Sequence, residues 1–141
     1  MLGFPDAERV VMEYVDDLGY CVTSTPPDLQ ERLPVIRVNR AGGNDDDVTD
    51  FPRMSIQTFC RADYESPRAA LGLMNRIRER VDDSSLPAWV PGERVTIEDS
   101  RTESGPVRAP WPDPQVQVVT AAFRLSISRP VKEEEKEPDN G

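Results

Sequence analysis

Three oxygen-bearing side chains near the middle of the sequence have the spacing of a calcium-binding loop. Asp45, Asp47 and Thr49 match its first half, in which alternate residues supply oxygen ligands to the ion. The central glycine is missing, and Ile56 stands where the loop needs a glutamate that binds through both oxygens. We therefore interpret this segment as the solvated tip of a hairpin.

The other reactive side chains form no catalytic constellation in the sequence. There is no histidine, which removes the commonest general base, the commonest metal ligand and the usual partner of a serine or cysteine nucleophile. Glu98 and Asp99 face opposite sides of a predicted strand, so they do not converge with Glu103 as an acid–base pair. Gly42–Gly43 precedes a strand rather than a helix N-terminus, so it is not a phosphate cradle. We expect no enzyme activity, no cofactor and no metal site.

Arginines on a predicted helix and two cysteines have plain structural interpretations. Arg76, Arg78 and Arg80 could contact an acidic partner or a phosphate. Alternate helix residues lie about 200° apart, however, so a solvated helix side is the favoured interpretation. Cys21 and Cys60 lie far apart in strand-like runs, and we expect both to be reduced and buried.

Composition indicates one small acidic domain. The 141 residues carry a net charge of −9, and 37% of them are hydrophobic, enough for one core. This charge argues against free nucleic acid as a ligand, because phosphate binding depends on lysine and arginine. No apolar run approaches the length of a membrane span, and the start of the chain lacks the pattern of a signal peptide. We expect synthesis and use in the cytoplasm, with no membrane partner.

Hydrophobic spacing predicts two helices and several strands. The first helix covers about residues 6–18 with Asp6 as its N-cap, and the second covers about 66–82 with Ser66 as its cap. Alternating patterns predict strands at 20–24, 35–40, 54–60, 94–103 and 115–128. The segments 25–34, 42–50, 84–92 and 105–114 are predicted to be loops, because they are rich in proline, glycine or aspartate.

These elements predict an α+β fold. We expect an antiparallel sheet of about four strands with two helices packed on one face. Residues 1–130 form the domain, and 131–141 form a disordered acidic tail, since that segment is charged and lacks an apolar face.

The two tryptophans lie in proline-rich segments. Trp89 and Trp111 could each act as an exposed binding anchor on a stiff loop. Either could equally close the open end of a small core. The sequence leaves both interpretations open.

Several stretches together resemble a known family. They are Leu18–Gly19 after the first helix, Leu33–Gly43 (LPVIRVNRAGG), Asp50–Phe59 (DFPRMSIQTF), the helix with Ala69–Leu71, and Pro110–Pro114 (PWPDP). Over about residues 5–129 this layout resembles the tail terminator, or tail completion, proteins of long-tailed bacteriophages, especially phages of actinobacteria. The acidic tail has no match in that layout.

This resemblance implies a structural virion protein at the head–tail interface. The family forms a ring, usually a hexamer, that caps the finished tail tube and meets the head connector on its other side. DNA passes its acidic lumen only as cargo, and no specific nucleic-acid binding is expected. Assembly takes place in the host cytoplasm.

We expect contacts with the tube, the connector or neighbouring subunits through the predicted hairpin loop and the tryptophan segments. The candidate interface residues are Asn44, Asp45, Asp46, Asp47, Asp50, Trp89, Trp111 and Asp113. Two alternatives stay open. One is a neck or head-closure connector, and the other is a small ligand-binding or enzymatic domain outside phages.

Overall fold

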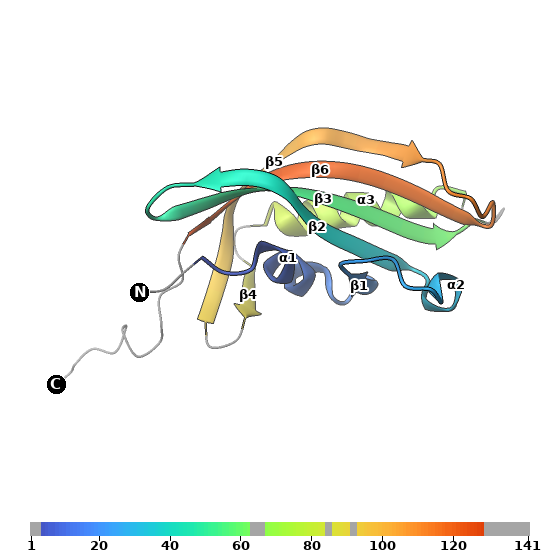
Figure 1. Ribbon diagram of the computed structural model, residues 1–141, viewed down its shortest axis with the longest axis horizontal. Coiled ribbons are helices and arrows are strands. Elements are labelled where there is room, and N and C mark those ends of the chain that lie inside the picture. Colours follow the sequence, from blue (N-terminus) through green and yellow to red (C-terminus); the bar gives the residue numbers. More distant parts are fainter. Residues whose placement is uncertain (1–3, 63–66, 84–85, 91–92, 129–141) are drawn as a thin grey trace.

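One curled sheet dominates the structure, which is a computed structural model that describes residues 4–62, 67–83, 86–90 and 93–128 (Figure 1). The strands are β1 (Tyr20–Val22), β2 (Val35–Asp45), β3 (Thr49–Arg61), β4 (Pro87–Val90), β5 (Glu93–Ala109) and β6 (Val116–Ser128), in the order β1-β2-β3-β6-β5-β4. The helices are α1 (Ala7–Val15), α2 (Leu29–Arg32) and α3 (Ala69–Val81).

The α+β class is confirmed, but the predicted sheet is too small. The described part of the chain forms six strands rather than four. β1 runs parallel to β2, and the other neighbouring strands are antiparallel. A third helix, α2, lies in the segment predicted to be a loop. The predicted tail, 131–141, lies outside the described residues.

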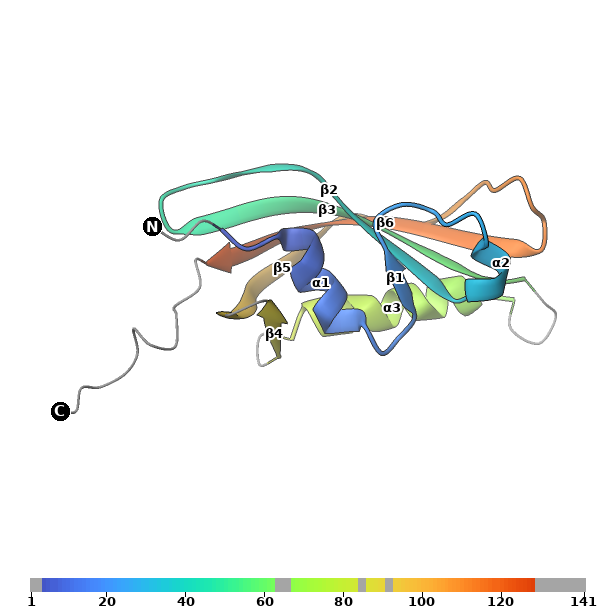
Figure 2. The same cartoon turned by 60° about the horizontal axis from the view of Figure 1, so that its bottom comes forward.

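Helices α1 and α3 cover one face of the sheet (Figure 2). The Asp6 carboxylate caps α1 as predicted, accepting hydrogen bonds from the backbone N–H groups of Glu8 (3.0 Å) and Arg9 (3.4 Å). The alternate residues of β6 that were predicted to share one face all reach this core: Val119, Ala121, Phe123, Leu125 and Ile127. The main core therefore lies between this face and the two longer helices.

The start of α3 differs from the prediction. The helix begins at Ala69, after Arg68, whose side chain does not cap it. Ser66, the predicted cap, lies outside the described residues. The buried Thr58 hydroxyl on β3 donates to the Ala70 carbonyl at 2.8 Å and so fixes the first turn of α3 against the sheet.

A second, smaller core lies on the opposite face of the sheet. Leu29 of α2 packs there with Val35, Phe59, Val116 and Val118. These strand residues alternate with the residues of the main core, and the pleat therefore directs them to the other side. The two predicted helices share the first face as expected, but α2, which the sequence did not predict, covers this end of the second face.

Strands extend into two predicted loops, 42–50 and 105–114, because β2 ends at Asp45, β3 begins at Thr49 and β5 ends at Ala109. Gly42 and Gly43 continue β2 with φ angles of 146° and 108°, beside a bulge in the pairing with β3. A Cβ atom at Gly43 would lie 2.2 Å from the Phe51 carbonyl oxygen, so glycine is required there. Gly105 and Pro106 continue β5 at a register shift between Ser104 and Val107, where a strand tolerates proline because no ladder bond is needed.

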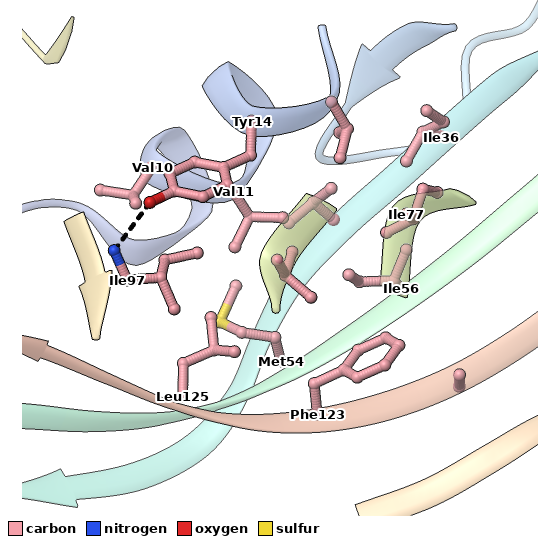
Figure 3. Packing of buried hydrophobic residues seen from close by; sticks show 14 of the residues in the cluster. Val10, Val11, Tyr14, Ile36, Met54, Ile56, Ile77, Ile97, Phe123 and Leu125 are labelled. Carbon is pink, nitrogen blue, oxygen red and sulfur yellow. Dashed lines mark hydrogen bonds between the residues drawn. The ribbon is translucent and has the colours of Figure 1, made fainter. Parts of the chain in front are cut away.

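The predicted loop that holds Trp89 also contains a strand. Residues 87–90 form β4, which pairs with β5 only from Glu93 to Thr96. The next residue, Ile97, pairs with β6 instead. At this change of partner the Tyr14 hydroxyl of α1 accepts the Ile97 N–H at 2.8 Å (Figure 3). The same hydroxyl donates to the Leu86 carbonyl. A buried tyrosine thus joins α1, β5 and the start of β4.

Candidate protein interface

The tip of the β2–β3 hairpin is the most exposed part of the described chain that carries predicted interface residues. Every residue from Arg40 to Val48 is exposed, and the tip lies at one end of the long axis of the molecule (Figures 1 and 2). Asn44, Asp45 and Asp47 keep the exposure that the sequence predicted. Val48, whose side chain is 62% exposed, lies beside these carboxylates.

Asp46, which is also exposed, orders the tip through its carboxylate. One carboxylate oxygen accepts the N–H groups of Val48 (2.8 Å) and Thr49 (2.7 Å). These two bonds hold the pKa of Asp46 below its usual range, because they favour the charged carboxylate. The tip is therefore a preformed turn with a fixed negative charge.

Asp50 is not a solvated loop residue, and the prediction that it is one is wrong. Its side chain is 2% exposed, on the side of the sheet covered by α1 and α3. Arg40 holds it with two parallel hydrogen bonds of 2.7 and 2.8 Å. The carboxylate raises the pKa of Arg40 by its hydrogen bond and its charge. Asp50 thus stabilises the base of the hairpin.

The two tryptophans have different surroundings. Trp111 packs its edge against Phe59, with ring centroids 5.1 Å apart, and closes the second core. Trp89 is 57% exposed on β4, the last strand of the described sheet. The structure therefore favours the core-closing interpretation for Trp111 and the binding interpretation for Trp89.

Asp113 connects the Trp111 segment to α2. One of its carboxylate oxygens accepts a hydrogen bond from the Gln30 side-chain amide, and the other accepts the Gln115 N–H at 2.9 Å. Trp111 and Asp113 line an open hollow of about 820 Å³ together with Arg108 and three prolines, Pro67, Pro110 and Pro114. This predicted contact region is an ordered surface at the end of the sheet opposite the hairpin tip.

Sequence reasoning missed a second groove at this end, which we call the α3 groove. It is open, has a volume of about 620 Å³ and lies between the first half of α3, the end of β3 and the segment before β2. Its lining includes Leu33, Pro34, Arg61, Ala69, Leu73 and Arg76. Arg61 and Arg76 form no ion pair with any described residue.

The three arginines of α3 do not act together. Arg80 binds Asp17 through two bonds of 2.7 and 3.0 Å, which lower the pKa of Asp17. Arg78 contacts Asn75 at 3.5 Å, whereas Arg76 lines the α3 groove. The solvated-side interpretation fits Arg76, which is exposed although it lines the groove, whereas Arg78 and Arg80 are half-buried.

Glu103 is engaged by arginines and is not placed as an acid–base residue. Arg53 of β3 and then Arg124 of β6 hold its pKa below the usual range. The Glu103–Arg124 ion pair measures 3.0 Å. Both cysteines are free thiols in the structure; Cys60 is buried as expected, but Cys21 is only half-buried.

Residues 4–62, 67–83, 86–90 and 93–128 hold no group of three or more His, Cys, Asp or Glu side chains that could bind a metal ion. In the same ranges, no helix is long and apolar enough to cross a membrane.

Comparisons with known proteins identify the family. The chain matches the model of a family described as "Phage tail termination protein" over residues 3–134. A search of curated proteins found no match. The family match covers most of the 141 residues and includes both the hairpin and the α3 groove. The chain therefore belongs to the phage tail termination protein family and is a structural protein of a bacteriophage tail.

Proposed function

We propose that the protein caps the finished tail tube as a ring and forms the tail side of the head–tail joint. The observation that carries this proposal is the family match over residues 3–134. The ring is a homo-oligomer, with six subunits expected, and its partners are the tail tube protein and the head connector.

The surface of the domain suits such assembly. The Trp111 hollow and the α3 groove are both open, and they are lined by loops, strand ends and the first half of α3. The exposed acidic tip, the exposed Trp89 and the Trp111 hollow offer three separate contact regions. A net charge of −9 lets DNA pass as cargo without being held, since phosphates are repelled by the carboxylates.

The test of this function has two parts. Light scattering and negative-stain imaging of the purified protein should show a ring, or the protein should form one when it is mixed with purified tail tubes and caps their ends. Phage that lack the protein should make overlong tubes. Free tails of normal length would instead identify a head-closure connector, and a monomer that ignores tubes would refute the proposal.

A further inference from the structure

The hairpin tip and the α3 groove lie at opposite ends of the same strands. The tip follows the end of β2 and precedes β3, whereas the groove uses the segment before β2 and the end of β3. The 13 residues of β3 separate them, a span of about 40 Å at the rise of an extended strand. The tip of one copy therefore cannot occupy its own groove, but it can reach that of a second copy.

The two surfaces are complementary in charge and polarity. The tip places the exposed side chain of Val48 among the carboxylates of Asp45 and Asp47. The groove has an apolar floor with Leu33, Ala69 and Leu73, and Arg61 and Arg76 at its sides. An apolar tip flanked by acids fits an apolar floor flanked by arginines.

We propose that the β2–β3 tip of one copy docks into the α3 groove of the next copy, with Val48 on the apolar floor and Asp45 and Asp47 beside Arg61 and Arg76. This inference rests on the proposed function, because it names the contact that joins neighbouring subunits of the ring. The contact is heterologous, and repeated heterologous contacts form a ring when the rotation between copies closes.

Local attraction can exceed the overall repulsion between two acidic copies. At physiological ionic strength charges are screened beyond about 8 Å, so the net charge of −9 on each copy acts weakly at a distance. Carboxylates and guanidinium groups in direct contact are screened much less. The turn held by Asp46 also limits the conformational freedom that the tip loses on docking.

The test is a charge exchange read by light scattering over a concentration series, alone and on purified tail tubes. The tip variant is Asp45→Lys/Asp47→Lys, and the groove variant is Arg61→Glu/Arg76→Glu. Each should raise the apparent dissociation constant at least about tenfold, because like charges then meet. The chain with all four substitutions should recover association, because opposite charges meet again in every contact.

Two variants match the charge changes away from these surfaces. Glu13→Lys/Glu98→Lys changes the net charge as the tip variant does, and Arg94→Glu/Arg101→Glu changes it as the groove variant does. All four positions are exposed, and both controls should associate like the wild type. Segment 63–66, which carries Asp63 and Glu65 and lies outside the described residues, stays unchanged in every variant.

Crosslinking detects the same contact when association is weak. A short bismaleimide should join the Val48→Cys variant to the Gly72→Cys variant in a mixture. It should not join the Glu13→Cys variant to the Gly72→Cys variant, because Glu13 lies on α1. Gly72 accepts a side chain, since a Cβ there meets no atom within 4 Å.

The outcomes separate this inference from the proposed function. If rings form and cap tubes equally well with either reversed surface, the docking contact is wrong and the capping function stands. If the charge exchange and the crosslink behave as expected but tubes are never capped, the contact stands and the proposed function fails. The docking contact is overturned if the wild type does not associate, alone or on tubes, and the Val48→Cys and Gly72→Cys variants do not crosslink.

Discussion

The Tyr14 hydroxyl occupies the point where β5 changes from one neighbouring strand to another, and its removal gives a sharp test of the packing. In Tyr14→Phe the Ile97 N–H loses its acceptor at a buried site, since Tyr14 is 3% exposed and Ile97 is 1% exposed. An unsatisfied buried donor costs about 1–3 kcal/mol. The Leu86 carbonyl loses its donor too, but Leu86 is half-buried and water can replace it. We expect a loss of about 2 kcal/mol in the free energy of unfolding.

Urea unfolding measures this loss directly. With a slope of about 2 kcal/mol per molar urea, the midpoint should fall by about 1 M. Tyr20→Phe makes the same chemical change at a residue 43% exposed and should stay within about 0.5 kcal/mol of the wild type. Hydrogen exchange should show loss of protection at the Ile97 amide in Tyr14→Phe alone. Equal stability of the two variants, or unchanged protection at Ile97, would refute the assigned role of this hydroxyl.

Alkaline pH gives a second readout for the same residue. Burial raises the pKa of Tyr14 above its ordinary 10.0, although the hydrogen bond from Ile97 lowers it in part. The folded state therefore binds the proton more tightly than the unfolded state. This contribution to stability is complete below pH 10 and is lost as the pH rises through the folded-state value. Stability should fall less steeply above pH 10 in Tyr14→Phe than in the wild type.

Three further predictions follow from the described residues. Gly43→Ala should destabilise the hairpin, because its φ of 108° and the Phe51 carbonyl leave no room for a Cβ atom. Gly72→Ala lies in open space on a helix and should instead stabilise the protein by about 0.5–1 kcal/mol. Equal melting temperatures of the two variants would contradict this contrast. Arg40→Met should lower the free energy of unfolding by about 2–4 kcal/mol in urea, at the lower end of the range for buried pairs because Arg40 is partly exposed. Adding Asp50→Asn should recover most of that loss. No recovery would show that the pair is not coupled. Burial, and then the charge of Asp16, raise the pKa of Cys21 to about 11. Alkylation of Cys21 should therefore be slow at pH 8 and should accelerate toward pH 11. Fast labelling at pH 8 in folded protein would contradict the burial.

Local patterns predicted the elements whose signals lie within one segment. The α1 stripe, the Asp6 cap and the alternation along β6 follow from spacing alone, since each pattern reports one buried face. The α+β class followed from the order of these elements. The resemblance stated from short stretches was confirmed by the family match over residues 3–134.

Partners distant in sequence determined what the patterns missed. Asp50 appeared to belong to a solvated acidic run, yet Arg40, which pairs with Met54 across the hairpin, reaches along the strand and holds its buried carboxylate with two hydrogen bonds. Glycine and proline at Gly43 and Pro106 indicated loops, but bulges accommodate them inside strands. The α3 groove could not be read from the sequence, because its walls come from three separate segments.

The register shifts of β5 have a consequence for the protein before it meets a tail. No described strand covers the outer edge of β5 from Ile97 to Ala109, and a bare strand edge invites endless sheet growth between molecules. Three irregularities in the pairing with β6, together with Pro106, disturb the regular row of donors and acceptors that such growth needs. Newly made copies can thus accumulate without stacking into fibres, and a straightened β5 would be an aggregation hazard rather than a gain in stability.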